Sequence, residues 1–217
     1  MLNLNKDSKS VLQKLVVISL FIFSNGCVSS PNVDDVGRAD IIHIESKALI
    51  EDKAKSESNT VNIDLFYKQN SAFRLEVSAM LGIQLGSLVM IPNQISYLLH
   101  QQKVFVVGPV TTKTTRPLFK YEIDPKILWA LVFDRDLAAY GFKCRISDKI
   151  TECVVNEKSL STTVTKETKD NGLKKMVIEN SVFRFVWIYK TMKKHNMSYN
   201  ETFVLKKPEE YRLITIK

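Results

Sequence analysis

Histidine is scarce in this sequence, and the usual signatures of catalysis are missing. The three histidines are His43, His100 and His195, and none of them stands in a metal-binding spacing such as H-E-x-x-H. The chain has no G-x-S-x-G motif for a serine nucleophile and no glycine-rich loop that would hold a phosphate. Asp134 and Asp136 lie at the end of an expected helix, where solvated charge explains them. We therefore expect no catalytic residues, no metal site and no cofactor.

Long hydrophobic runs are also absent, because no apolar stretch reaches the about 20 residues that span a bilayer core. The run Leu15–Phe23 is too short to do so. It follows three lysines and leads into the small residues Ser24 to Gly26. A basic start, a short apolar middle and small residues are typical of a secretory signal peptide. We interpret residues 1–26 as this signal.

Cys27 directly follows these small residues, and the arrangement resembles the lipobox of bacterial lipoproteins. In that family the cysteine is lipidated and becomes the first residue. Gly26 and Cys27 fit the pattern, whereas Ser24 stands where the family usually has leucine. Two or more acyl chains hold a protein stably on a membrane, so the sequence predicts a lipid-anchored protein with a polar tether over residues 27–40. The alternative is a secreted protein in which Cys27 is a free thiol.

Acidic residues are outnumbered, at 23 Asp and Glu against 31 Lys and Arg. A basic residue beside an anionic membrane adds about 1 kcal/mol of binding free energy. These contributions would add up only if the basic residues formed a one-sided patch, and they are scattered along the chain. We interpret them as a solvated surface, and export excludes nucleic acid as a partner. The composition is 45% hydrophobic and 25% charged, typical of a globular chain. We expect one monomeric domain over residues 41–217.

The chain has only three cysteines, which leaves Cys144 and Cys153 once Cys27 carries lipid. An oxidising compartment favours a disulfide between them. The small ring would stabilise the fold by about 2.5–3 kcal/mol in the loop-entropy model. Two free thiols or a metal pair are the alternatives, although no histidine lies near them in sequence.

Alternation of apolar and polar residues dominates the chain after residue 41 and predicts strands. The clearest is Phe73–Ala79, whose residues Arg74, Glu76 and Ser78 are expected on a wet face. Further strands are predicted where the alternation returns, including Thr202–Leu205 and Tyr211–Ile216. Asn171-Gly172 between two alternating runs signals a hairpin. Asp124 and Pro125 start a helix that should close one side of the core.

A strand near the C-terminus places four aromatic rings on one side: Phe183, Phe185, Trp187 and Tyr189. Aromatic residues favour strands and bury a large area, so a solid core explains them on their own. However, one clear helix has to cover a sheet of about 8–11 strands. A curved sheet with few helices leaves an apolar concavity where small apolar ligands bind. The alternatives are therefore a filled core and an acyl-chain cavity.

A second candidate is the expected hairpin tip at Met80, Leu81 and Gly82. A leucine at a tip has no obvious neighbour to bury against. Either the tip folds back onto the core, or Leu81 enters a membrane or a partner's groove. Burying one leucine yields roughly 1.5–3 kcal/mol, enough to steer contact but too little to anchor a protein.

The order of these predicted strands, the hairpin tip and the helix resembles that of the LolB family of outer-membrane lipoprotein receptors. The resemblance covers roughly residues 41–216, and its best local piece is F-R-L-E-V-S-A-M-L-G at Phe73–Gly82. It implies a mainly β fold: a half-open antiparallel β-barrel covered by one to three helices. It also implies a cavity for lipoprotein acyl chains, received from a periplasmic carrier similar to LolA. Cavity-lining residues would be Leu75, Val77, Phe183, Phe185 and Trp187.

In that family an exposed leucine on a protruding loop delivers cargo into the membrane, and Leu81 occupies the matching position. The family's tryptophan-rich first strands are absent here, and the Cys144/Cys153 pair is not a family feature. Val28 after the cysteine, rather than Asp, favours the periplasmic face of the outer membrane by the same resemblance. Two hypotheses follow: a lipid-handling receptor with an open cavity, and a structural or assembly lipoprotein with a filled core.

Overall fold

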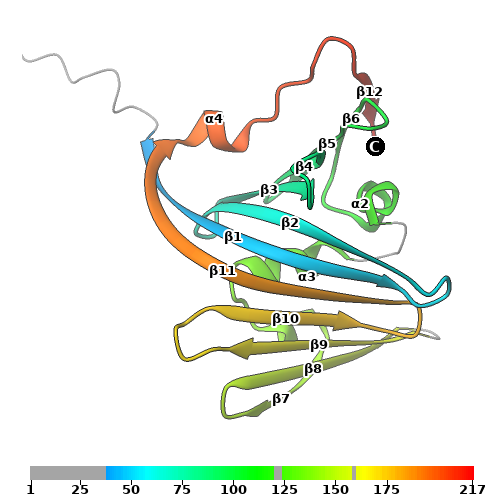
Figure 1. Cartoon of the computed structure of the whole chain (residues 1–217), viewed down its shortest axis with the longest axis vertical. Coiled ribbons are helices and arrows are strands. Elements are labelled where there is room, and N and C mark those ends of the chain that lie inside the picture. Colours follow the sequence, from blue (N-terminus) through cyan, green and yellow to red (C-terminus); the bar gives the residue numbers. More distant parts are fainter. Residues whose placement is uncertain (1–37, 120–123, 158–159) are drawn as a thin grey trace, which may run out of the picture. The chain divides into compact units, whose positions relative to one another are not determined.

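The computed structural model describes residues 38–119, 124–157 and 160–217, and this part of the chain forms one 12-stranded sheet with three α-helices (Figure 1). The first six strands are β1 (Arg38–Asp52), β2 (Glu57–Lys68), β3 (Ala72–Ala79), β4 (Gln84–Ile91), β5 (Gln94–Leu99) and β6 (Val104–Gly108). The later strands are β7 (Lys143–Ser147), β8 (Ile150–Glu157), β9 (Leu160–Thr168), β10 (Lys174–Glu179), β11 (Phe183–Ser198) and β12 (Arg212–Thr215).

The strands are ordered β12-β6-β5-β4-β3-β2-β1-β11-β10-β9-β8-β7. Every neighbouring pair is antiparallel except β12 and β6, which are parallel. The long strands β1 and β11 pair at the centre, with a bulge between Glu45 and Ser46. The sheet is open and curled (Figure 1), which confirms the predicted mainly β fold class with one strand more than the upper expectation. β1 begins at Arg38, so residues 38–40, which we assigned to the tether, belong to a strand.

The inner face of the sheet, defined as the face that packs against α2 (Thr112–Phe119) and α3 (Pro125–Val132), carries the main core. Leu65, Phe73 and Tyr97 from the strands are buried there with Leu131 and Phe133 from α3 and its C-cap. The helix starts as the sequence predicted. The Asp124 side chain accepts a hydrogen bond of 2.9 Å from the Lys126 backbone N–H, and Pro125 occupies the first turn.

Helix α2 was not predicted, because Thr112–Phe119 is rich in threonine and holds Pro117, and both residue types are poor helix formers. Tertiary contacts hold it in place. The Tyr97 hydroxyl donates to the Thr114 carbonyl at 3.1 Å, and burial raises the pKa of Tyr97 to about 12. Gly108 permits the close approach, since a Cβ there would lie 2.8 Å from Thr114 Oγ1.

The outer face, defined as the opposite face of the sheet, carries a second core cluster under the C-terminal segment. Ile41, Val89 and Phe105 of the sheet pack with Phe203 and Leu205. The predicted strand Thr202–Leu205 is wrong: helix α4 (Tyr199–Phe203) forms instead. The Ser198 side chain caps this helix, and its backbone carbonyl accepts from the Thr202 hydroxyl at 2.8 Å.

Asp134 ties the end of α3 to the distant strands β9 and β10. Its carboxylate lies 3.3 Å from Lys166 Nζ and 2.9 Å from Lys174 Nζ. Burial by itself raises the pKa of the Asp134 carboxyl, but hydrogen bonds and charges from the two lysines outweigh it and hold the pKa below its usual value. The ion pairs therefore depend on pH.

We expect Asp134→Asn to lower the free energy of unfolding by up to about 1 kcal/mol at pH 7, since the carboxylate is more than half exposed. A lowered folded-state pKa stabilises the fold at every pH above the unfolded pKa, and this contribution is lost as pH falls through the folded pKa. Urea denaturation of both proteins should show the difference shrinking from pH 5 to pH 2. The control is Asp148→Asn, which makes the same change at an exposed residue in a turn. An equal Asp134→Asn cost at pH 7 and pH 2 would contradict the assignment.

Candidate functional site

An apolar cavity of about 320 Å³ lies between the inner face and the two helices. Leu118 of α2 and Leu128 of α3 line it on one side, and Phe185 and Trp187 of β11 line it on another. The remaining wall comes from residues of β1 to β5 and the turn after β5: Ile50, Val61, Ile63, Leu75, Val77, Leu85, Gly86, Ser87, Leu88, Leu99, Gln101 and Gln102. The two helices thus cover part of the inner face but leave a hollow against it.

Four of the five residues predicted to line a cavity meet in it: Leu75, Val77, Phe185 and Trp187. Phe183 does not line the hollow. It is buried at 4% exposure within the same core, where it pairs with Asp52 at the end of β1. The alternation of the aromatic strand therefore identified the correct face, whereas the extent of the hollow along that face depends on residues of other strands.

Gly86 helps to explain why the hollow forms at this place. It pairs with Val77 across β3 and β4, so the inner face lacks a side chain beside Val77. A Cβ at Gly86 would lie 2.8 Å from the Leu98 carbonyl oxygen, a distance that real Cβ atoms do not adopt. Backbone packing therefore restricts this position to glycine, and the missing side chain leaves space above the sheet.

None of the described residues that line the cavity is charged, and the buried polar groups Trp187 and Ser46 beneath it are paired. The Trp187 indole N–H donates to Ser46 Oγ at 2.7 Å, and Ser46 Oγ donates to the Ile63 carbonyl at 2.7 Å. Burying an unpaired charge in such a place is costly. The hollow can accept hydrocarbon, and only its Gln101 and Gln102 side can meet a polar group.

The predicted tip residues form the turn between β3 and β4, next to the cavity end at Val77 and Gly86. Gly82 has a φ of 79° and its N–H donates to the Ala79 carbonyl at 2.9 Å. The side chains of the tip are turned outward: Met80 is 66% exposed, Leu81 90% and Ile83 58%. An apolar projection therefore stands at the same end of the sheet as the apolar hollow.

The cysteines lie apart from these features. Cys144 and Cys153 are directly opposite each other in β7 and β8, and a disulfide joins them. Cys153 is buried in the inner core, whereas Cys144 is exposed. The lipid attachment predicted at Cys27 lies outside the described residues.

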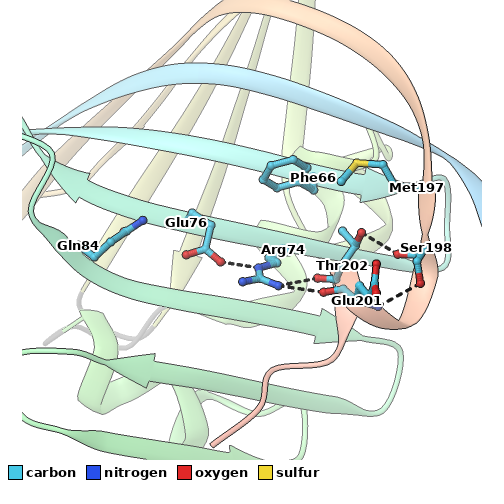
Figure 2. Close-up of a pocket in the computed structure, with 8 residues that line it drawn as sticks. All are labelled: Phe66, Arg74, Glu76, Gln84, Met197, Ser198, Glu201 and Thr202. Carbon is cyan, nitrogen blue, oxygen red and sulfur yellow. Dashed lines mark hydrogen bonds and ion pairs between the residues drawn. The ribbon is translucent and has the colours of Figure 1, made fainter. Parts of the chain in front are cut away.

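A second pocket, of about 540 Å³, opens on the outer face between β3 and α4 (Figure 2). Arg74 crosses it, donating to the Glu76 carboxylate and to the Thr202 carbonyl at 3.0 Å (Figure 2). Arg74 and Glu76, expected on a wet face, are only 24% and 16% exposed because the C-terminal segment covers them. The Arg74–Glu76 pair holds α4 to the sheet through the Thr202 carbonyl. We therefore interpret this pocket as structural and call these three residues the outer clasp.

The clasp continues into a chain of hydrogen bonds along the outer face. Ser87 donates to the second Glu76 oxygen, and His100 Nδ1 lies 2.8 Å from the Tyr211 hydroxyl. The sequence analysis did not predict these hydrogen bonds, because the residues that form them come from four separate segments. Among the residues that the structure describes, no group of three or more His, Cys, Asp or Glu side chains is placed to hold a metal ion.

Comparisons with known proteins give fold likenesses only. No family model matches the sequence, and no curated protein matches it. An uncharacterized conserved protein from Thermus thermophilus is similar in structure, with a TM-score of 0.43 and 9% identity, covering 79% of this chain and 90% of that chain. Within the described residues, no helix is long and apolar enough to cross a membrane.

Two other solved structures are similar to the same extent. A LolA superfamily protein from Nitrosomonas europaea has a TM-score of 0.43 and 8% identity, covering 76% of this chain and 90% of that chain. A DUF1329 family protein from Desulfovibrio piger has a TM-score of 0.44 and 8% identity, covering 78% of this chain and 91% of that chain. At these identities the chain is not assigned to any of their families.

Proposed function

We propose that this chain is an envelope lipoprotein, attached through Cys27 to the periplasmic face of the outer membrane, whose cavity binds an acyl chain. The observation that carries the proposal is the hollow lined by Phe185 and Trp187, in which no described lining residue is charged. Ligand pockets are lined mainly by apolar and aromatic side chains with a few polar groups that set orientation. Gln101 and Gln102 are the groups suited to meet the polar end of a lipid.

The size of the hollow limits what it holds. Its volume of about 320 Å³ is near the lower end of the range of about 300–1,000 Å³ for ligand pockets. It therefore suits one hydrocarbon chain, or part of one, rather than several chains side by side. Each methylene group removed from water contributes about 0.8 kcal/mol, so micromolar affinity, which corresponds to about 8 kcal/mol, requires burial of roughly ten carbons.

The finer part of the proposal is delivery of lipoproteins to the outer membrane, with cargo received from a carrier similar to LolA. It is supported by the sequence resemblance and by the position of the Met80–Ile83 tip beside the cavity. A tip that enters the lipid headgroup region would bring the hollow to the membrane surface. The cargo's acyl chain would then leave one apolar environment for another.

The test is binding of a fluorescent fatty acid to the soluble chain lacking residues 1–27. We expect saturable binding of one ligand per chain in the micromolar range. Absence of binding at micromolar protein would contradict the proposal and favour the alternative, a structural or assembly lipoprotein that contacts other envelope proteins. That alternative predicts a filled core, and the hollow is the observation against it.

We expect Leu81→Gln to slow the transfer of a bound fluorescent acyl ligand to phospholipid vesicles by about tenfold to 100-fold, because leucine burial yields roughly 1.5–3 kcal/mol. Stability should not change, since Leu81 is 90% exposed. Ile146→Gln is the matched control, because Ile146 is 76% exposed on the distant β7. Equal transfer rates for the two variants would exclude a membrane role for the tip.

A further inference from the structure

The apolar cavity is closed at one end. The strand residues of its wall that lie farthest from the β3–β4 turn are Leu75 and Leu88, which are paired across the two strands and are 8% and 3% exposed. The next inward-facing pair on these strands is Phe73 and Met90, which are buried and do not line the cavity. The Phe133 ring packs edge-on against Phe73, with centroids 6.1 Å apart. The cavity therefore ends against a filled aromatic core.

The opposite end, next to the β3–β4 turn, is the mouth of the cavity. Leu85 and Leu99 line it and are half-buried, and Ile50 is 37% exposed. Gln101 and Gln102, from the turn after β5, are exposed beside them. A hydrocarbon chain that enters here places its methyl end at the closed end and leaves its polar end beside the two side-chain amides.

The space between the mouth and the closed end limits how much of a chain is enclosed. The cavity has a volume of about 320 Å³. A methylene group is close in size to a water molecule, whose share of liquid volume is about 30 Å³, so the hollow encloses about ten methylene groups. Side chains of a close-packed core have little room to move. Leu75 and Leu88 therefore form a fixed stop.

We propose that the cavity takes an acyl chain methyl end first and measures its length against the stop formed by Leu75 and Leu88. This inference rests on the proposed acyl-binding function and adds which chains that site favours. Each methylene group that enters raises the affinity about fourfold. The increase ends at about ten carbons, because the further carbons of a longer chain remain outside the mouth in water. A shorter chain leaves part of the hollow empty and binds more weakly.

The test is displacement of a fluorescent fatty acid from the soluble chain lacking residues 1–27 by saturated fatty acids of six to sixteen carbons. The described residues belong to one compact unit that contains both core clusters, so the shortened chain keeps the sheet. We expect the affinity to rise about fourfold with each added carbon and to become constant beyond about ten. Every competitor is used below its critical micelle concentration.

A variant of the stop should move this limit. Leu88→Ala leaves room at the closed end, and the affinity should then keep rising for about three more carbons, the number that the side chain loses. Leu65→Ala is the matched control, because Leu65 is 0% exposed, pairs with Leu75 across β2 and β3, and does not line the cavity. It should leave the limit unchanged. If circular dichroism shows that a variant is unfolded, the length series of the unmodified chain still decides.

Photocrosslinking tests the direction of the chain in the cavity. A fatty acid with a diazirine at its methyl end should crosslink to the peptides that contain Leu75 and Leu88. A fatty acid with the diazirine beside its carboxyl group should crosslink to the turn that contains Gln101 and Gln102. Mass spectrometry of the digested protein locates both crosslinks.

Three outcomes would overturn the inference and leave acyl binding intact. The first is an affinity that rises steadily up to sixteen carbons. The second is a limit that Leu88→Ala and Leu65→Ala move equally. The third is crosslinking of the methyl end at the mouth. Failure of every chain length to displace the probe would instead contradict the proposed function itself, and this inference with it.

Discussion

Replacing Val77 with tryptophan should weaken acyl-chain binding by about 100-fold while the sheet remains folded. Val77 is half-buried, lines the cavity and pairs with Gly86, which has no side chain to clash with a larger neighbour. An indole at this position would occupy the space of about three or four methylene groups. At about 0.8 kcal/mol per methylene group, their exclusion corresponds to roughly 2.5–3 kcal/mol, or about 100-fold in affinity.

Ser78→Trp is the matched control for this variant. Ser78 follows Val77 in β3, is also half-buried and faces the outer side of the sheet. Titration with a fluorescent fatty acid should therefore give near-normal affinity for Ser78→Trp and a large loss for Val77→Trp, with matching circular dichroism spectra. Equal affinities would place the ligand somewhere other than this cavity.

Replacing Trp187 with alanine should cost about 3–5 kcal/mol of stability, the range for large aromatic residues in a core. Trp187 is 1% exposed and packs edge-on against Tyr189, with ring centroids 5.4 Å apart. Its indole N–H also donates a hydrogen bond to Ser46, which would lose this partner. For a domain of this size such a loss lowers the melting temperature by roughly 10 °C.

Urea denaturation monitored by circular dichroism measures this cost. Trp129→Ala removes the same side chain from a half-buried place and should cost less, about 1–2 kcal/mol. The comparison separates loss of buried area from loss of a tryptophan as such. A cost below about 1.5 kcal/mol for Trp187→Ala, under the usual range for such a truncation, would mean that the surrounding core collapses and that the hollow above it is not maintained by rigid walls.

The strands and the start of α3 follow from local signals. Alternation identified β1, β2, β3 and β5, which follow a period of two residues, whereas β4 is buried on both faces over Gly86–Met90. Asp124-Pro125 and Asn171-Gly172 were confirmed as a helix start and a hairpin turn, and Gly172 has a φ of 76°. In these places local propensity and tertiary packing favour the same structure.

The remaining elements depend on contacts that no local pattern contains. All five residues of β7 are exposed, so alternation does not mark this strand, and pairing with β8 forms it. Helix α2 forms from unfavourable residues because Gly108 and Tyr97 hold it. Alternation also misplaced Arg74 and Glu76 on a wet face, since the segment that covers them lies far along the chain.

The candidate site was predicted only in part, because it also depends on contacts between segments that are distant in sequence. The aromatic strand indicated which face is apolar, but the size of the hollow depends on Gly86 and on two helices that approach from elsewhere. The outer clasp combines short segments that are separated in sequence. Its individual residues carry no motif, so only the folded arrangement identifies it.

The central pairing of the sheet sets the timing of folding. β1 pairs with β11, and Ser46 and Trp187 meet although 141 positions separate them. Such distant contacts form slowly, and here they cannot form until nearly all of the polypeptide has been synthesised. A chain that stays open until its last strands emerge can be threaded through a secretion channel and close its sheet only on the far side.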